Sequence, residues 1–242
     1  MKARKLIKSI SGMIGYYRFA NKREYQGRPF NTQLFRQKIF RELMEQCNFS
    51  AIFETGTFLG TTTEYMYRES KLNVYSVESD PWRYGFCHAR FMWNKHIKIC
   101  LGDSRTFLRI SFEKEEFHDN PVFIYLDAHS HGDLPLKKEC EIILGSGVES
   151  VIMIDDFEVP GDPGYGFDDY GFGKRLSLEY LRSLDNYYYS IFFPNCMSDK
   201  ETGHRRGCVV IATSERLTDI LRDTETLVEF KKKAPTSEKL DA

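Results

Sequence analysis

Neither charge predominates in this sequence, since 34 Lys and Arg residues stand against 35 Asp and Glu in a chain of 242 residues. Proteins that bind nucleic acid usually carry a strong positive excess, so we expect no nucleic-acid partner. The chain also lacks an uninterrupted apolar run of the roughly 20 residues that cross a bilayer. Membrane-spanning and nucleic-acid-binding proteins are therefore the first classes to be excluded.

The six cysteines include no C-x-x-C pair. In a chain of this length, without a secretory leader, scattered cysteines are typical of reduced thiols that fill the core. We therefore expect a cytoplasmic protein whose fold does not depend on disulfides.

Hydrophobic residues make up 41% of the chain and aromatic residues 14%, which is enough for a core. From residue 51 onward, short apolar runs alternate with amphipathic stretches, a pattern typical of an α/β fold with a mostly parallel sheet covered on both faces. The expected strands are 51–53, 72–77, 97–101, 122–126 and 151–154, and the expected helices are 61–70, 84–94, 104–110, 136–144 and 174–184. Two last runs, 187–193 and 208–212, have no helix between them and predict an antiparallel hairpin.

Composition divides the chain into three regions. We expect a basic N-terminal helical cap over 1–48, the main domain over 49–213, and a helix with a disordered tail over 214–242. The first 28 residues contain eight Lys or Arg and one acid, with apolar residues between them at helical spacing. Either this is a basic amphipathic helix that contacts an anionic membrane surface, or it is a cap helix with a solvated charged face.

The stretch from Glu54 to Thr63 ends an apolar run, passes through Gly56 and Gly60, and enters a helix-compatible segment. This order predicts a strand, a tight turn and a helix N-terminus. Glycine lets a ligand approach the backbone closely, and the first helical turn offers unpaired N–H groups. We therefore expect a nucleotide-type ligand at this turn.

Each of the five expected parallel strands ends in acidic residues. These are Glu54, Glu78, Asp103, Asp127 and the pair Asp155 and Asp156. A single acid could simply cap a helix, but five together on the edge where open parallel sheets bind ligands indicate a site. Clustered carboxylates repel one another, a cost that a bound cation or ligand offsets.

Two functions compatible with this turn and these acids need consideration. Glu78 lies about 20 residues beyond Gly56, as the ribose-binding acid does in nicotinamide-dependent oxidoreductases. The turn, however, reads G-x-x-x-G instead of G-x-G-x-x-G, and Glu54 would face a pyrophosphate unfavourably. A cofactor with a cationic amino-acid portion suits Glu54 better. The second alternative is a non-catalytic binding protein that keeps the fold without the chemistry.

As a set, these motifs resemble class I S-adenosylmethionine-dependent methyltransferases. The matching segments, within residues 50–213, are Glu54-Thr-Gly56-Thr-Phe-Leu-Gly60, Val77-Glu78, Leu101-Gly102-Asp103-Ser104 and Phe123-Ile-Tyr-Leu-Asp127. The resemblance implies a Rossmann-like, doubly wound, seven-stranded sheet of order 3-2-1-4-5-7-6 with the last strand antiparallel.

The same resemblance implies roles for the matching residues. Glu54, Gly56 and Gly60 would surround the methionine portion of S-adenosylmethionine, with Thr57 and Thr61 of the same loop. Glu78 would hold the ribose hydroxyls, and Asp103 with Ser104 would border the adenine.

Asp127, Asp155 and Asp156 resemble the carboxylates of metal-dependent O-methyltransferases of the catechol and macrolide-sugar types. A hard Mg²⁺ ion with oxygen ligands suits such a trio. It would lower the pKa of a substrate hydroxyl and orient its oxygen. The alternative is that one member of the Asp155-Asp156 pair caps a loop while the other faces the substrate without a metal.

The catechol type has a lysine three residues after the first aspartate, where this chain has Ser130. His129 and His131 follow Asp127 instead, and an imidazole is suited to taking a hydroxyl proton near neutral pH. We expect one of the two histidines to be the general base. The long glycine-rich loop 159–173, with four aromatic residues, would either contact the acceptor or lie along the sheet edge. The sequence thus predicts an O-methyltransferase for a hydroxylated small molecule or glycan.

Overall fold

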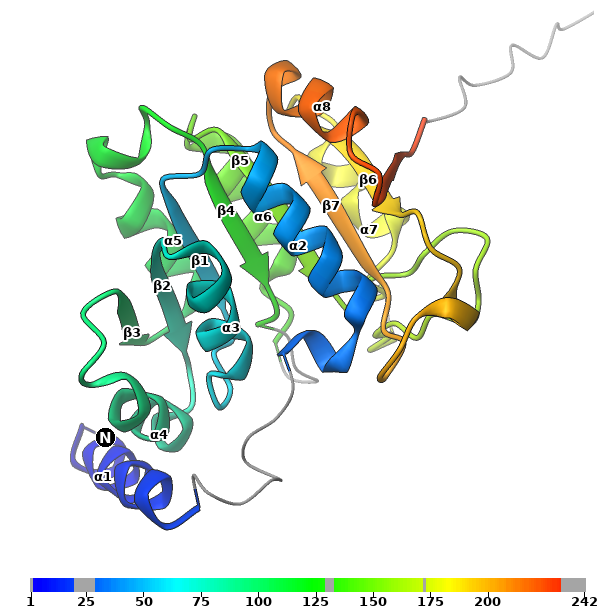
Figure 1. Ribbon diagram of the computed structural model, residues 1–242. Helices are drawn as coiled ribbons and strands as arrows, with labels where there is room; N and C mark the ends of the chain where they lie inside the picture. The colour runs from blue at the N-terminus through cyan, green and yellow to red at the C-terminus, as the bar shows by residue number, and fades with distance from the viewer. Residues whose placement is uncertain (1, 20–28, 129–132, 172, 232–242) are drawn as a thin grey trace, which may run out of the picture.

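The computed structural model describes residues 2–19, 29–128, 133–171 and 173–231 (Figure 1). Within these ranges the strands form one eight-stranded sheet in the order β3-β2-β1-β4-β5-β7-β6-β8. The strands are β1 (Ala51–Thr55), β2 (Asn73–Glu78), β3 (Ile97–Leu101), β4 (Val122–Leu126), β5 (Ser150–Asp155), β6 (Ser190–Pro194), β7 (Cys208–Ala212) and β8 (Leu227–Glu229).

Strands β1 to β5 pair in parallel, whereas β7 runs antiparallel to both β5 and β6. The predicted Rossmann-like sheet, its order and its antiparallel strand are therefore confirmed. The eighth strand is additional, and it pairs antiparallel with β6. With three residues, β8 is too short to show an alternating pattern. Its start is fixed by a distant partner, since Glu42 accepts hydrogen bonds from the backbone N–H groups of Glu225 and Thr226.

The helices cover both faces of the sheet (Figure 1). The α-helices are α1 (Lys2–Phe19), α2 (Leu34–Gln46), α3 (Thr61–Ser70), α4 (Pro81–Phe91), α5 (Ser104–Phe112), α6 (Leu136–Gly145), α7 (Leu178–Leu181) and α8 (Glu215–Arg222). Short 3₁₀ turns are η2 (Pro29–Thr32), η3 (Glu115–Phe117), η4 (Arg182–Leu184) and η5 (Ser198–Lys200).

Two apolar clusters form the core, one on each face. Helices α2, α3, α4 and α8 contribute to the first cluster, and α5, α6 and α7 to the second. Alternation along β1 connects the two, because Ile52 belongs to the first cluster and Phe53 to the second. The predicted covering of both faces is thus present.

The helix expected over 174–184 is shorter than predicted. Only α7 and η4 are helical, because the preceding backbone makes hydrogen bonds with the long loop instead. The N–H of Leu176 donates to the carbonyl of Asp168, and the carbonyl of Leu176 accepts from Glu158 N–H. These tertiary contacts, absent from any local pattern, replace the first turns of the expected helix.

The helix expected near the N-terminus is present as α1, which lies against α4 outside the sheet (Figure 1). Among the described residues, no helix combines the length and the apolar character that a bilayer crossing needs. The division of the chain at residues 48 and 213 stays a prediction. The expected disordered tail falls mainly on residues 232–242, outside the described part.

Candidate functional site

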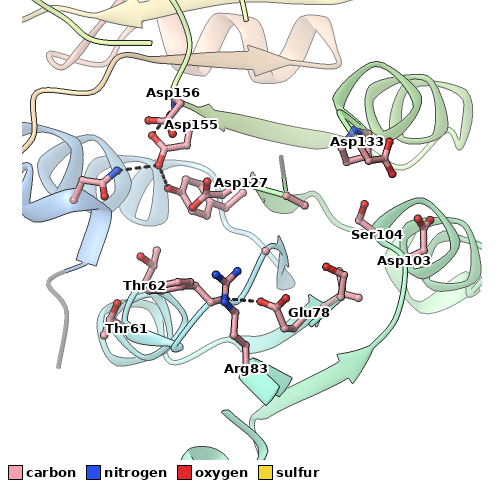
Figure 2. A pocket seen from close by; sticks show the side chains of 18 of the residues that line it. Thr61, Thr62, Glu78, Arg83, Asp103, Ser104, Asp127, Asp133, Asp155 and Asp156 are labelled. Atoms are coloured by element: carbon pink, nitrogen blue, oxygen red, sulfur yellow. Dashed lines mark hydrogen bonds between the residues drawn. The ribbon is translucent and has the colours of Figure 1, made fainter. Parts of the chain in front are cut away.

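A cavity of about 550 Å³ lies at the carboxyl ends of the parallel strands. This volume is in the range of small-molecule sites. Its wall contains Gly56, Thr61, Glu78, Asp103, Ser104, Asp127, Asp155 and Asp156 among the residues predicted from sequence. Figure 2 shows the aspartates 127, 155 and 156 together at one end of the cavity, while Asp103 and Ser104 lie at the other. The sheet edge therefore gathers the strand-end acids as expected.

The turn after β1 needs glycine at two positions. Gly56 has φ +87°, and a Cβ there would collide with the backbone carbonyl of Asp127. Gly60, with φ +77°, immediately precedes α3, and a Cβ there would meet the ring of Phe91. An L side chain is disfavoured at such φ values even where space exists. The approach of the turn to Asp127 after β4 and to Phe91 of α4 thus explains why both positions are glycine.

Glu54 does not line the cavity but lies in a buried network behind the turn. Its Oε2 atom accepts hydrogen bonds from the hydroxyls of Thr63 (2.5 Å) and Ser76 (2.6 Å). Thr57 joins the same network through its hydroxyl, 2.6 Å from Ser76 Oγ. Burial raises the pKa of Glu54 to about 7, although the two hydrogen bonds oppose this shift. This carboxyl therefore keeps its proton to a higher pH than an exposed glutamate does.

Glu78, at the end of β2, is fixed by backbone donors. Its Oε2 accepts from Phe58 N–H (2.9 Å) and its Oε1 from Asp80 N–H (2.8 Å). Burial raises the pKa of Glu78, while these hydrogen bonds lower it. The guanidinium of Arg83, also on the cavity wall, stacks over the Phe58 ring at 4.6 Å from its centroid. Glu78 can accept further hydrogen bonds only in the orientation that these partners set.

Asp103 caps α5 and also lines the cavity. Its side chain accepts from the backbone N–H groups of Arg105 (3.1 Å) and Thr106 (3.2 Å). The guanidinium of Arg105 bridges Asp103 and Asp133, and its hydrogen bonds hold the pKa of Asp103 below the ordinary value. The capping function that a single strand-end acid suggests is thus present here, together with a place on the cavity wall.

Asp127, Asp155 and Asp156 form an acidic trio in which one carboxylate oxygen from each residue lies within 4.8 Å of the other two. Burial and the charges of the other two aspartates raise the pKa of Asp127 well above its ordinary value. Burial and Asp155 likewise raise the pKa of Asp156 to about 6, against the effect of Arg206. The trio therefore remains a site of mutual repulsion, which a cation with a preference for oxygen ligands would relieve.

Residues far from the trio in the chain hold it in place, and they are not among the residues expected from the motifs. Arg36 of α2 forms a buried ion pair with Asp155, which also accepts from the hydroxyl of Tyr125 (2.6 Å) and from Asn31 Nδ2 (3.3 Å). Burial lowers the pKa of Arg36, but the surrounding charges, that of Asp155 first, outweigh it and the pKa lies above its ordinary value. The sequence does contain one indication of this buried ion pair, because Arg36 lies on the apolar face of a helix.

Arg206 holds the other side of the trio. Its Nε lies 2.5 Å from Asp156 Oδ1, and its Nη2 pairs with Asp168 of the long loop. Asp156 has φ +54°, so its backbone adopts a left-handed conformation that non-glycine residues rarely take. Asp156 is thus joined through Arg206 to Asp168 of the long loop.

The two histidines predicted as general base, His129 and His131, lie outside the described residues. His204, which the sequence analysis did not select for catalysis, is exposed and lines the same cavity as Asp155 and Asp156. Its backbone N–H donates to the Asn31 carbonyl (3.1 Å), which fixes the loop before β7 beside the N-terminal segment.

No protein-family model matches the chain, and a search of curated proteins finds no relative. Solved structures do match. An O-methyltransferase from Bacillus cereus in complex with S-adenosylhomocysteine is 17% identical, with a TM-score of 0.51 over 74% of this chain and 81% of that one. The O-methyltransferase TomG from Streptomyces achromogenes, involved in tomaymycin synthesis and solved with S-adenosylmethionine, is 13% identical, with a TM-score of 0.50 over 74% and 79%. The chain therefore has the fold of class I S-adenosylmethionine-dependent methyltransferases, as its motifs predicted.

Proposed function

We propose that the protein is an S-adenosylmethionine-dependent methyltransferase that methylates a hydroxyl oxygen of a small molecule or glycan with the help of Mg²⁺. The observation that carries this proposal is the acidic trio of Asp127, Asp155 and Asp156 in the same cavity as Glu78 and Asp103. Three carboxylates at one end suit a divalent cation, and acids at the other end suit hydroxyls and an adenine amine.

The cofactor end of the cavity would follow the roles that the motif resemblance implies. Gly56 and Thr61 of the cavity wall would contact the methionine portion, with Glu54, Thr57 and Gly60 buried behind them. The sulfonium of S-adenosylmethionine supplies the electrophilic methyl group. The carboxylate of Glu78, held by two backbone N–H donors, would accept hydrogen bonds from ribose hydroxyls.

At the other end, Asp127, Asp155 and Asp156 would hold Mg²⁺, which supplies Lewis-acid activation of a hydroxyl when bound. Arg36 and Arg206 keep two of these carboxylates oriented. The general base would be His129 or His131, next to Asp127. Most of the remaining acceleration of a methyl transfer would come from alignment of the acceptor oxygen with the methyl group.

Cofactor binding is tested by titration calorimetry with S-adenosylhomocysteine. We expect saturable binding that weakens at least about tenfold in Glu78→Ala, because hydrogen bonds to a charged carboxylate are lost. NAD(P)H should not bind. Binding of NAD(P)H in place of S-adenosylhomocysteine would identify an oxidoreductase, and binding of neither would favour the non-catalytic alternative.

Metal binding is tested separately by titration with Mn²⁺ in the absence of substrate. Electron paramagnetic resonance measures how much of the Mn²⁺ is bound. Asp127→Asn and Asp156→Asn should each weaken Mn²⁺ binding by about tenfold or more. Asp168→Asn is the matched control, since Asp168 shares Arg206 with Asp156 but lies outside the trio. Equal Mn²⁺ affinity in all three variants would refute the metal part of the proposal and leave the cofactor part standing.

A further inference from the structure

Helix α1 contacts α4 through small residues and through Tyr16, whose ring lies edge-on to that of Phe86 at 5.3 Å between centroids. Ser9, Gly12 and Gly15 are buried against α4. A Cβ added at Gly12 would collide with the Trp82 carbonyl, and one added at Gly85 would collide with the Ser9 carbonyl. The two helix backbones therefore approach closely, and α1 is held in one orientation.

This orientation turns the apolar face of α1 away from the protein. The outward side chains are exposed to 62% (Leu6), 67% (Ile7), 48% (Ile10), 48% (Ile14) and 68% (Tyr17). At 100° per residue, these five positions span about 100° of the helix circumference. A surface helix normally turns such a stripe toward the core. We call these five residues the α1 stripe.

The charges of α1 are all of one sign. The helix contains no acidic residue, and its described basic side chains, Arg4, Lys5, Lys8 and Arg18, are exposed. Three of them, Arg4, Lys5 and Lys8, surround a surface groove of about 440 Å³ beside Pro81, the first residue of α4. Cationic side chains around a shallow groove suit the phosphate of a lipid headgroup.

The apolar surface continues beyond α1 at the end of α4. The hydroxyl of Tyr17 lies 3.4 Å from the sulfur of Met92, which is itself 43% exposed. The next residue, Trp93, is 89% exposed. Trp and Tyr are the side chains that gather at the boundary between headgroups and acyl chains.

We propose that α1 lies in the surface of an anionic lipid bilayer, with the α1 stripe in the acyl boundary and its basic residues among the headgroups. An amphipathic helix with a basic polar face and an outward apolar face has the features of such binding. A second copy of the chain fits less well, because a twofold interface would place the basic side chains of α1 against themselves.

This surface lies beside the candidate site. Pro81 follows Glu78 of the cavity wall by three residues, and Figure 1 shows α1 and α4 at the end of the sheet where the parallel strands finish. Bilayer binding does not depend on methyl transfer, and it can be measured with the unmodified chain.

The test is flotation of the full chain with vesicles of phosphatidylcholine, alone or mixed with phosphatidylserine. We expect binding to the mixed vesicles only, and a marked loss at high salt. The triple variant Arg4→Gln, Lys8→Gln, Arg18→Gln should bind on the order of 100-fold more weakly, at roughly fivefold per basic residue.

The apolar contribution is tested with Ile10→Ser combined with Ile14→Ser, which should weaken binding at least about tenfold. Ile110→Ser is the matched control, because Ile110 is 57% exposed on α5 and should not contact the bilayer. The triple variant has its own control in Arg109→Gln, Lys137→Gln, Lys138→Gln. Each variant is first checked by circular dichroism and by S-adenosylhomocysteine titration.

Equal flotation of the variants and their controls would overturn the proposal, as would absence of binding to the mixed vesicles. A dimer in light scattering that Ile10→Ser with Ile14→Ser converts to monomer, without vesicle binding, would assign the α1 stripe to a second copy. Loss of cofactor binding with intact flotation would refute the proposed function alone.

Discussion

The buried carboxyl of Glu54 allows a quantitative prediction. Its pKa rises from an ordinary value of 4.5 to about 7 because it is removed from water. Above pH 4.5 the unfolded chain releases this proton while the native state keeps it. The contribution of Glu54 to the free energy of unfolding is therefore complete below pH 4.5 and is lost as pH rises through 7. At 1.36 kcal/mol per pKa unit, the complete loss is about 3 kcal/mol, of which about 2.5 kcal/mol falls between pH 5 and pH 8.

Glu54→Gln replaces the ionisable group by a neutral one of the same shape. The side-chain oxygen can still accept from Thr63 and Ser76. We therefore expect the free energy of unfolding of the variant to rise by about 2.5 kcal/mol relative to that of the native protein between pH 5 and pH 8. The measurement is urea unfolding at each pH, followed by the fluorescence of Trp82 and Trp93.

The comparison must be made between variant and native protein at each pH. Burial also raises the pKa of Glu139 to about 7, so the native protein loses stability over the same window for a second reason. That contribution cancels in the difference as long as the two sites are independent. A second variant, Thr63→Val, removes one hydrogen bond that lowers the pKa of Glu54, and should move the window to higher pH. A difference between Glu54→Gln and the native protein that stays constant from pH 5 to pH 8 would refute the reasoning.

Three further predictions concern the site. Arg36→Met should lower the free energy of unfolding by about 3–5 kcal/mol, because it leaves Asp155 buried without its cation; urea unfolding measures this, and Asp155→Asn in the same chain should restore part of it. Gly56→Ala should cost about 1–3 kcal/mol and abolish S-adenosylhomocysteine binding in calorimetry, because φ is +87° and the Cβ collides with the Asp127 carbonyl. Mg²⁺ at 100 times its dissociation constant should stabilise the native protein by about 2.7 kcal/mol in thermal unfolding, and Asp156→Asn should remove this gain; a gain of the same size in the variant would contradict the assignment.

The sequence predicted the fold because the relevant signals are local. Four elements, Thr61–Ser70, Ile97–Leu101, Val122–Leu126 and Cys208–Ala212, have the expected bounds, and each is set by its own periodicity and neighbouring turn. β8 and the shortened α7 were not predictable in this way. β8 depends on the side chain of Glu42 and on pairing with β6, and the segment before α7 makes backbone hydrogen bonds with the long loop.

The candidate site likewise has a part that local sequence patterns predict and a part that they do not. Strand ends can be read from a sequence, so the trio of Asp127, Asp155 and Asp156 was expected and its side chains do meet. Their partners Arg36 and Arg206 belong to other elements, and no spacing rule connects them to the acids. The roles of the predicted residues in binding and catalysis stay predictions, including those of the two histidines after Asp127.

The ion pairs of the trio also set when the site can form during synthesis. Arg36 is made 119 residues before Asp155, whereas Arg206 follows Asp156 by 50 residues. At 5–20 residues per second, roughly 3–10 s separate the appearance of Asp156 from that of its arginine. During that interval a nascent chain carries the acids with only the earlier partner available. Synthesis of the loop before β7, which contains Arg206, therefore completes the site.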